Sequence, residues 1–143
     1  MSIISIGLPV YNATRTLKLA VASVLGQSFQ DWELIICDDA STDDSFEIAT
    51  SIRDARIRVV RNARNLGLSA CLDRFVELAQ APLVARMVSD DLLHPDRLRR
   101  QVDVFEAHSD IEVVSTDAFV VDDHNRVLGG RRKGEIVPTA AGI

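Results

Sequence analysis

The 143-residue sequence contains no apolar run that reaches the roughly 18 residues needed for a membrane-spanning helix. Its start, MSIISIGLPVYN, lacks the basic segment that opens a signal peptide, and Pro9 and Asn12 end the apolar run early. We therefore expect no membrane span in this chain and predict a cytoplasmic protein. Peripheral attachment to the inner face of the membrane stays open as an alternative.

Cysteine and lysine are both scarce. The only cysteines, Cys37 and Cys71, lie inside apolar segments, which predicts two buried free thiols and a reducing compartment. Only Lys18 and Lys133 among the sixteen basic residues are lysines, so recognition of an anion would depend on arginine. The net charge of −5 disfavours nucleic-acid binding, because such proteins neutralise phosphates with basic side chains.

What is present is the composition of a folded globular protein. Hydrophobic residues make up 47% of the chain and charged residues 26%, and the length is sufficient for a domain of ordinary size with its own core. We predict a single domain over residues 1–143. Its core is expected at 1–122, and a hairpin with an incomplete tail at 123–143.

Short apolar runs alternate with longer segments of helical period. Strands are expected at residues 3–10, 32–39, 57–62, 82–88 and 111–116, the last with the sequence IEVVST. Helices are expected at residues 14–26, 41–52, 67–79 and 96–108, and a hairpin at 118–130 with Asp-His-Asn at its turn. Thr14 is the expected N-cap of the first helix, and Pro95 suits the first position of the fourth. This alternation predicts a Rossmann-like three-layer α/β/α fold with a mostly parallel sheet.

Polar and acidic segments follow four of the predicted strands, at the ends where parallel sheets bind ligands. They read PVYNA, CDDASTDD, RNARNLG and VSDDLLHPD. Adjacent residues that leave a strand point to different sides, so one carboxylate of the pair Asp38-Asp39 could face a cleft while the other braces the loop. Capping of the following helix by both acids is the alternative.

A second acidic pair, Asp90-Asp91, ends the fourth predicted strand. Two like charges about 4 Å apart repel by roughly 4 kcal/mol at an effective dielectric constant of about 20, so solvent or a cation should compensate. Mg²⁺ and Mn²⁺ commonly take one or two protein carboxylates and complete their shell with phosphate oxygens and water. Acidic pairs on two loops therefore favour a metal-bound phosphate ester, and solvated loop acids are the alternative.

Five motifs in this order resemble the nucleotide-sugar-binding half of the family 2 inverting glycosyltransferases, which have a GT-A type fold. They are PVYN, QSFQDWELIICDDASTDDS, RNxxNxGLSA, ARMVSDDLLHPDRL and VVSTDAFVVDD, and they cover about the first 120 residues. The resemblance implies transfer of a sugar from a UDP-, dTDP- or GDP-sugar donor to a hydroxyl of a saccharide or lipid-linked acceptor, with inversion. It also implies assistance by Mn²⁺ or Mg²⁺, and a place in the synthesis of cell-surface polysaccharide, lipopolysaccharide or glycoconjugates.

The resemblance further implies which residues form the nucleotide site. Tyr11 would offer a stacking surface to the base, Asp39 would hydrogen-bond the base or ribose, and Asp38 would be mainly architectural or a weaker contact. Gly67 would permit close approach of the backbone, and Arg86 could reach the nucleotide or a nearby acid. The complete expected set is Pro9, Tyr11, Asn12, Asp38, Asp39, Asn65, Gly67, Arg86 and Asp90.

The metal motif departs from the family pattern. Relatives usually read Asp-x-Asp-Asp where this chain has Val88-Ser89-Asp90-Asp91. Asp90 and Asp91 are the expected metal ligands, and Asp90 matches the acid that generally coordinates the cation. Val88 replaces the first acid, which implies weaker binding of nucleotide or metal.

The family enzymes also run well beyond 200 residues, so the general base is expected beyond Ile143 and the chain is expected to be truncated. A catalytically inactive nucleotide-sugar-binding module, or a fragment without the acceptor half, is the main alternative. A dinucleotide-dependent oxidoreductase is set aside because G-x-G-x-x-G does not follow the first strand. A receiver-like signalling domain would require a lysine at a late strand end, where neither Lys18 nor Lys133 is placed.

Overall fold

The computed structural model describes residues 2–131. The chain divides into two compact units, with the boundary between Pro95 and Asp96. Each unit is described by itself. The expected single domain over residues 1–143 stays a prediction.

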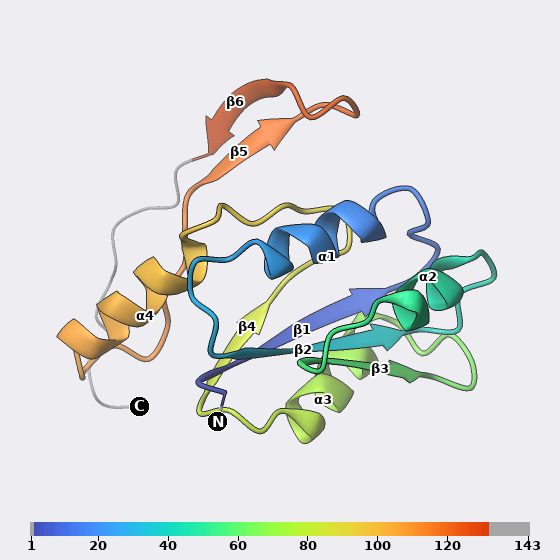
Figure 1. The fold of residues 1–143 in the computed structure, drawn as a ribbon, viewed down its shortest axis with the longest axis horizontal. Coiled ribbons are helices and arrows are strands. Elements are labelled where there is room, and N and C mark those ends of the chain that lie inside the picture. Colours follow the sequence, from blue (N-terminus) through green and yellow to red (C-terminus); the bar gives the residue numbers. More distant parts are fainter. Residues whose placement is uncertain (1, 132–143) are drawn as a thin grey trace. The chain divides into compact units, whose positions relative to one another are not determined.

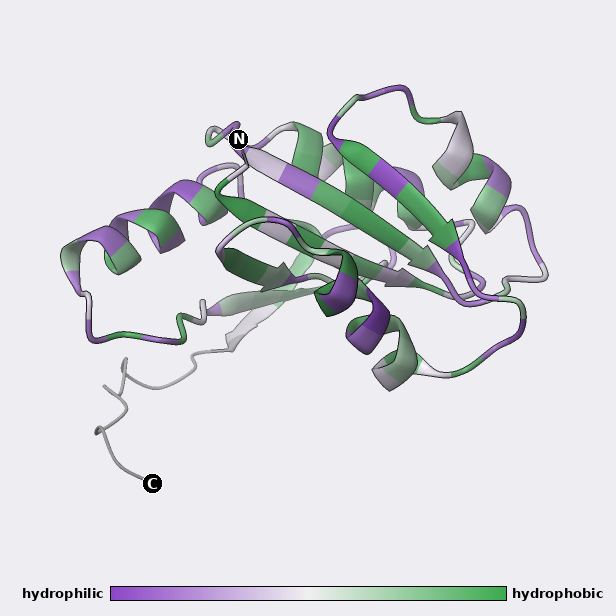
Figure 2. Cartoon of the chain, turned by 90° about the horizontal axis from the view of Figure 1, so that it is seen from below, coloured by the Kyte–Doolittle hydropathy of each residue, from purple (hydrophilic) through white to green (hydrophobic). Residues whose placement is uncertain are grey.

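The first unit is built on a four-stranded parallel sheet (Figure 1). The strands are β1 (Ile4–Val10), β2 (Trp32–Asp38), β3 (Ile57–Arg61) and β4 (Leu83–Arg86), in the spatial order β3-β2-β1-β4. Every residue of β1 is buried, as expected for a central strand that is covered on both faces. Figure 2 shows hydrophobic colour along most of the length of these strands. The parallel sheet and the first four predicted strands are therefore confirmed.

Three helices connect the strands: α1 (Leu17–Leu25), α2 (Ser45–Ser51) and α3 (Leu68–Leu78). The chain moves outward from β1 to β3 and then returns to the far side of β1 to form β4. Because parallel crossovers are right-handed, this reversal places α3 on the opposite face of the sheet from α1 and α2. The contacts agree, since α1 packs with α2 whereas α3 packs on β1 and β2.

The close packing of α3 on the sheet depends on Gly7 in the middle of β1. A Cβ atom at Gly7 would lie 2.5 Å from two ring carbons of Phe75, a buried residue of α3. The neighbouring Pro9 is tolerated in a central strand for a different reason. The strand β4 ends opposite Gly7, so no ladder hydrogen bond from position 9 is needed on that side.

Three predicted helix starts are wrong by a few residues. The second helix, expected from residue 41, begins at Ser45. The first helix begins at Leu17 with Thr16 as its N-cap, because the Thr14 hydroxyl donates instead to the carboxylate of Asp43 in the loop after β2. In the fourth helix, α4 (Arg97–Ala107), the N-cap is Asp96, so Pro95 precedes the helix. The predicted end of the first helix at Gly26 is confirmed, because its N–H donates to the carbonyl of Ala22.

The second unit contains α4 and a hairpin of β5 (Ala118–Val121) and β6 (Val127–Arg131). The predicted hairpin is confirmed. Its turn is closed by Asp122, whose Oδ1 accepts hydrogen bonds from the backbone of His124 and Arg126, while Asn125 adopts φ 60°. The tail predicted after Gly130 lies outside the described residues, apart from the backbone of Arg131.

The predicted fifth strand, IEVVST at 111–116, is wrong. The structure gives these residues no helix or strand, and the side chain of Val113 is 73% exposed. A run of β-branched residues has strand propensity, but a strand forms only where a neighbouring segment supplies hydrogen-bond partners.

Two expectations from composition can be compared with the structure. Cys37 and Cys71 are buried free thiols, as predicted. Among residues 2–131, no helix is both long and apolar enough to cross a bilayer.

Candidate functional site

A pocket of about 490 Å³ lies in the first unit where β1 and β2 end and α3 begins. Seven of the nine predicted nucleotide-site residues line it: Pro9, Tyr11, Asn12, Asp39, Asn65, Gly67 and Asp90. The remaining lining residues are Val10, Ala13, Thr16, Leu68, Cys71, Val88 and Ser89. The acids that follow the second and fourth strands therefore do meet in one pocket, through Asp39 and Asp90.

Asp39 is the most tightly held acid of the pocket. Its Oδ1 accepts hydrogen bonds from the Asn62 amide at 2.7 Å and the Leu66 N–H at 2.9 Å, and its Oδ2 accepts one from the Gly67 N–H at 2.8 Å. Burial disfavours the charged form of Asp39, but these hydrogen bonds outweigh burial and lower the pKa of the carboxyl. The pocket therefore presents an ionised, acceptor-only group whose orientation is fixed.

Asp38 faces away from this pocket and has a structural role. Its carboxylate is fully buried, and Oδ2 lies 3.1 Å from the Arg61 guanidinium and 3.2 Å from the Ser41 N–H. Arg61 also donates to the Ser41 carbonyl at 2.9 Å. These contacts tie the end of β3 to the loop after β2. The mainly architectural role expected for Asp38 stays a prediction.

The loops after β1 and β2 are joined by side-chain hydrogen bonds. Asn12 adopts φ 50°; its Oδ1 accepts from the Thr42 N–H at 2.8 Å, and its own N–H donates to the Ser41 hydroxyl at 3.1 Å. The Ala13 N–H donates to the Ser45 hydroxyl at 2.8 Å. Asn12 thus shapes the wall of the pocket through its backbone conformation, and its side-chain oxygen is already used.

Asp43 makes the strongest of these loop contacts. It accepts hydrogen bonds from the backbone and hydroxyl of Thr14 and from the backbone of Ser45. Burial disfavours its charged form, but the hydrogen bonds from Ser45 and Thr14 prevail and lower the pKa of Asp43 to about 2.

Gly67 closes the pocket at the start of α3. It precedes the helix with φ +88° and ψ 167°, a region that is essentially restricted to glycine. This conformation turns the Gly67 N–H toward Asp39. A Cβ atom at Gly67 would meet nothing within 4 Å, so the glycine is required by its backbone conformation. The close approach of its backbone to a nucleotide stays a prediction.

The metal ligands predicted from the sequence are only partly brought together. Asp90 is exposed and lines the pocket beside Val88 and Ser89, whereas Asp91 and Arg86 are exposed and do not line it. Among the described residues, no group of three potential ligands could hold an ion by itself. Of the two predicted metal ligands, only Asp90 lies at the pocket. A single carboxylate suits a Mg²⁺ or Mn²⁺ ion that takes most of its ligands from phosphate and water.

Cys71 is a pocket residue that the sequence did not reveal, because helical periodicity placed it on the core side of α3. Burial, together with the neighbouring Cys37 and Asp39, raises the pKa of the Cys71 thiol to about 12. Asn62 was also missed as the partner of Asp39, although it directly follows a strand at the same edge of the sheet. That position was the signal that could have identified it.

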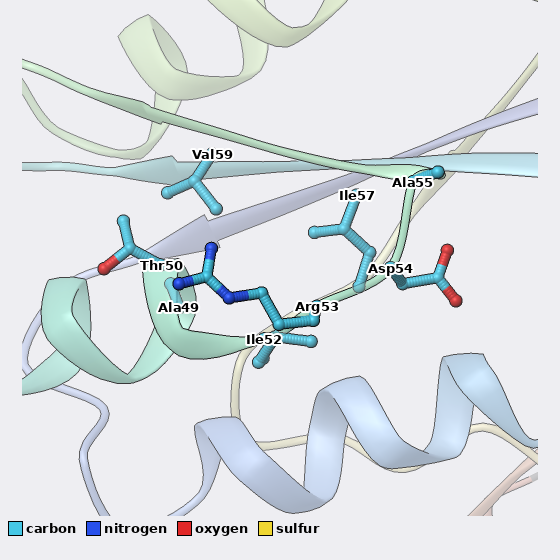
Figure 3. Close-up of a pocket in the computed structure, with 8 residues that line it drawn as sticks. All are labelled: Ala49, Thr50, Ile52, Arg53, Asp54, Ala55, Ile57 and Val59. Carbon is cyan, nitrogen blue, oxygen red and sulfur yellow. The ribbon is translucent and has the colours of Figure 1, made fainter.

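A second hollow, of about 520 Å³, lies between the end of α2 and β3 (Figure 3). Its walls are polar and apolar in nearly equal measure: Ile52, Ile57 and Val59 are among the apolar residues, and Arg53 and Asp54 are the charged ones. None of the predicted site residues lines it. We therefore place the candidate site at the pocket that contains Asp39 and Asp90.

The chain is similar in sequence to known glycosyltransferases. Residues 5–140 match the family model described as glycosyl transferase family 2. EpsE of Bacillus subtilis, named as an inferred glycosyltransferase, is 37% identical over 95% of this chain and 48% of its own length. WfaP of Escherichia coli, named as a UDP-Glc:α-D-GlcNAc-diphosphoundecaprenol β-1,3-glucosyltransferase, is 32% identical over 74% of this chain and 42% of its own length. The chain thus spans about half the length of these relatives.

Solved structures show the same fold. TarS of S. aureus in complex with UDP-GlcNAc superposes with a TM-score of 0.72 at 23% identity, over 76% of this chain and 32% of TarS. A mannosyltransferase of Pyrobaculum calidifontis in complex with GDP-Man and Mn²⁺ superposes with a TM-score of 0.69 at 18% identity, over 86% of this chain and 36% of its own. The fold of the chain is therefore of the GT-A type.

Proposed function

Since the chain belongs to glycosyltransferase family 2, we propose that its pocket binds the nucleoside diphosphate part of a sugar donor and that the protein transfers the sugar to an acceptor hydroxyl with inversion. The observation that carries this proposal is the meeting of Asp39 and Asp90 in one pocket. The two acids come from loops about fifty residues apart in sequence, and each suits a different part of the donor.

Asp39 is the group proposed to recognise the nucleoside. As an ionised carboxylate it accepts a hydrogen bond from a ring N–H of a base or from a ribose hydroxyl. Tyr11 lines the same pocket and is 49% exposed, so its ring is available for stacking on the base. Hydrogen bonding by Asp39 would select the base or ribose, and stacking by Tyr11 would add affinity.

Asp90 is the proposed ligand of a Mn²⁺ or Mg²⁺ ion. When bound, such an ion would neutralise the negative charge that develops on the departing diphosphate. Val88 also lines the pocket, and its side chain has no oxygen to offer a metal ion. We therefore propose that the cation binds weakly unless a diphosphate is present to complete its shell.

The acceptor side is proposed from the family and the relatives. A saccharide or lipid-linked hydroxyl would attack the anomeric carbon opposite the leaving diphosphate, and the general base would be an acid outside this pocket. A UDP-, dTDP- or GDP-sugar is the proposed donor class. Cytoplasmic localisation stays a prediction. The second candidate function is a nucleotide-sugar-binding module without transferase activity, which the replacement of an acid by Val88 favours.

Titration calorimetry tests the donor site. We expect UDP, dTDP or GDP to bind in the presence of Mn²⁺. Asp39→Asn should weaken that binding by roughly 10- to 100-fold, because a hydrogen bond to a charged group contributes about 1.5–3 kcal/mol. Asp90→Asn should abolish the effect of Mn²⁺. Asp73→Asn, on the exposed surface of α3, is the matched control and should bind like the wild type.

Two results would contradict the proposal. One is the failure of all three nucleoside diphosphates to bind the wild-type chain with Mn²⁺ at millimolar concentration. The other is unchanged binding in Asp39→Asn. Transfer itself is measured with radiolabelled sugar nucleotides and a lipid-linked acceptor, and inversion is determined from the anomeric configuration of the product. The assay is run on this chain and on the complete gene product, and binding without transfer by the complete gene product would favour the inactive module.

A further inference from the structure

We propose that Asn62 and Arg74 are positioning residues, which orient the carboxylate of Asp39 so that its Oδ2 is presented to the nucleoside. This proposal rests on the proposed function, because it concerns how the same pocket recognises its ligand. Neither residue lines the pocket. They act through Asp39, from the end of β3 and from the middle of α3.

The register of the sheet brings Asn62 to Asp39. Asp38 is paired with Arg61 in the ladder between β2 and β3, so the next residues, Asp39 and Asn62, leave their strands side by side. Asn62 is only 6% exposed, and its amide nitrogen lies 2.7 Å from Oδ1 of Asp39 and 3.5 Å from the sulfur of Cys71. The two amide protons of Asn62 are therefore directed at two separate acceptors.

Arg74 and Asp39 together hold the amide of Asn62 in one orientation. Rotation of an asparagine amide by about 180° around its Cβ–Cγ bond exchanges the positions of the oxygen and the nitrogen. Nη1 of Arg74 lies 2.5 Å from Oδ1 of Asn62 and 2.9 Å from the carbonyl oxygen of Arg61. A guanidinium can only donate, so the turned amide would set its N–H groups against Arg74 and its oxygen against the Asp39 carboxylate. Both contacts would be repulsive, so one orientation is strongly favoured.

The consequence is an unequal use of the two oxygens of Asp39. Oδ1 accepts two hydrogen bonds, from Asn62 and Leu66, whereas Oδ2 accepts one, from Gly67. Of the two, Oδ2 therefore keeps the larger acceptor capacity for a ligand. Because the carboxylate is held in place before the ligand arrives, little conformational freedom is lost when a base N–H or ribose hydroxyl binds to it.

Loss of Arg74 should therefore weaken recognition of the nucleoside and leave recognition of the diphosphate intact. We expect Arg74→Met to bind its tightest nucleoside diphosphate, chosen from UDP, dTDP and GDP with Mn²⁺, about tenfold more weakly than the wild type. Pyrophosphate with Mn²⁺ has no base or ribose and should bind unchanged. The control Arg58→Met removes the same charge from an exposed position on β3 and should leave both affinities unchanged.

Two further variants separate orientation from folding. A single nitrogen of Arg74 makes both contacts, so Arg74→Lys, which keeps a donor-only cation, should bind the nucleotide within about threefold of the wild type. Arg74→Gln offers Asn62 either an oxygen or a nitrogen, so it should behave like Arg74→Met. It serves as the second neutral variant if Arg74→Met does not fold, as judged by thermal unfolding.

An NMR measurement on the ligand-free protein tests the positioning separately. The two side-chain amide protons of Asn62 should exchange slowly with solvent in the wild type, because the amide is held by Asp39 and Arg74. In Arg74→Met and Arg74→Gln they should exchange faster and their signals should broaden or shift, because the amide samples more than one orientation. Unchanged Asn62 signals, wild-type nucleotide affinity in both neutral variants, or an equal loss of nucleotide and pyrophosphate affinity would overturn the proposal. A wild-type chain that binds no nucleotide but shows the expected NMR change would overturn the proposed function alone.

Discussion

The substitution Gly7→Ala should destabilise the first unit through a single steric conflict. An added methyl carbon would lie 2.5 Å from Cδ1 and Cγ and 2.8 Å from Cδ2 of Phe75, distances that real Cβ atoms essentially never show. Phe75 is 4% exposed, so its ring cannot turn aside into solvent. Overpacking of this kind costs about 1–3 kcal/mol, and replacing glycine by alanine within a strand recovers about 0.5–1 kcal/mol. We expect a net loss of about 1–2 kcal/mol in the free energy of unfolding.

Urea unfolding of a double-mutant cycle measures this effect. Phe75→Leu alone should destabilise by about 1–2 kcal/mol, but in the Gly7→Ala background it should cost less, because the narrower side chain relieves the conflict. Gly129→Ala is the control, since a Cβ atom at that position would meet nothing within 4 Å. If Gly7→Ala is as stable as Gly129→Ala, or if the two substitutions in the cycle are additive, the steric reasoning is wrong.

Three other predictions concern the loops and the thiols. Asp43→Asn should lower the free energy of unfolding at pH 7 by about 1–2 kcal/mol, because the lowered pKa of Asp43 stabilises the fold where the carboxyl is ionised. Most of this difference should disappear between pH 4 and pH 2, as urea unfolding at several pH values can measure. Gly67→Ala should cost about 1–3 kcal/mol of stability, from its φ of +88°, and should weaken nucleotide binding in calorimetry because the contact to Asp39 is disturbed. At pH 8, Cys37 and Cys71 should react with a disulfide reagent at least about tenfold more slowly in the native protein than in urea, because burial raises the pKa of both thiols. Equal rates in the native protein and in urea would contradict the buried placement.

Much of the fold could be predicted because the information was local. The buried strands β1 and β2 are continuous apolar runs, and their alternation with amphipathic helices determines the parallel topology. The run at 111–116 is also rich in β-branched residues but formed no strand, because pairing depends on a partner that is distant in sequence. Thr14 likewise had a suitable residue type for an N-cap, but a contact with Asp43, 29 residues away, shifted the helix start.

The candidate site was predictable to the level of which loops meet. The rule that ligands bind at the carboxyl ends of parallel strands was enough to bring Asp39 and Asp90 together. This rule could not rank the acids within each pair, since whether Asp90 or Asp91 reaches the pocket depends on the turn at residues 89–90. The role of Arg74 was invisible for a similar reason. It arises from the rotation of α3 about its own axis, which sequence periodicity gives only coarsely.

The single hydrogen atom that Gly7 carries in place of a side chain also governs the depth of the pocket. It lets α3 rest directly on β1, and the same helix supplies Leu68 and Cys71 to the pocket wall. A larger residue at this position would lift the helix and widen the pocket without touching any bound molecule. In a mutational survey that measures only ligand affinity, Gly7 would therefore be counted among the binding residues. Its effect is indirect, because it sets the distance between α3 and β1 and does not line the pocket.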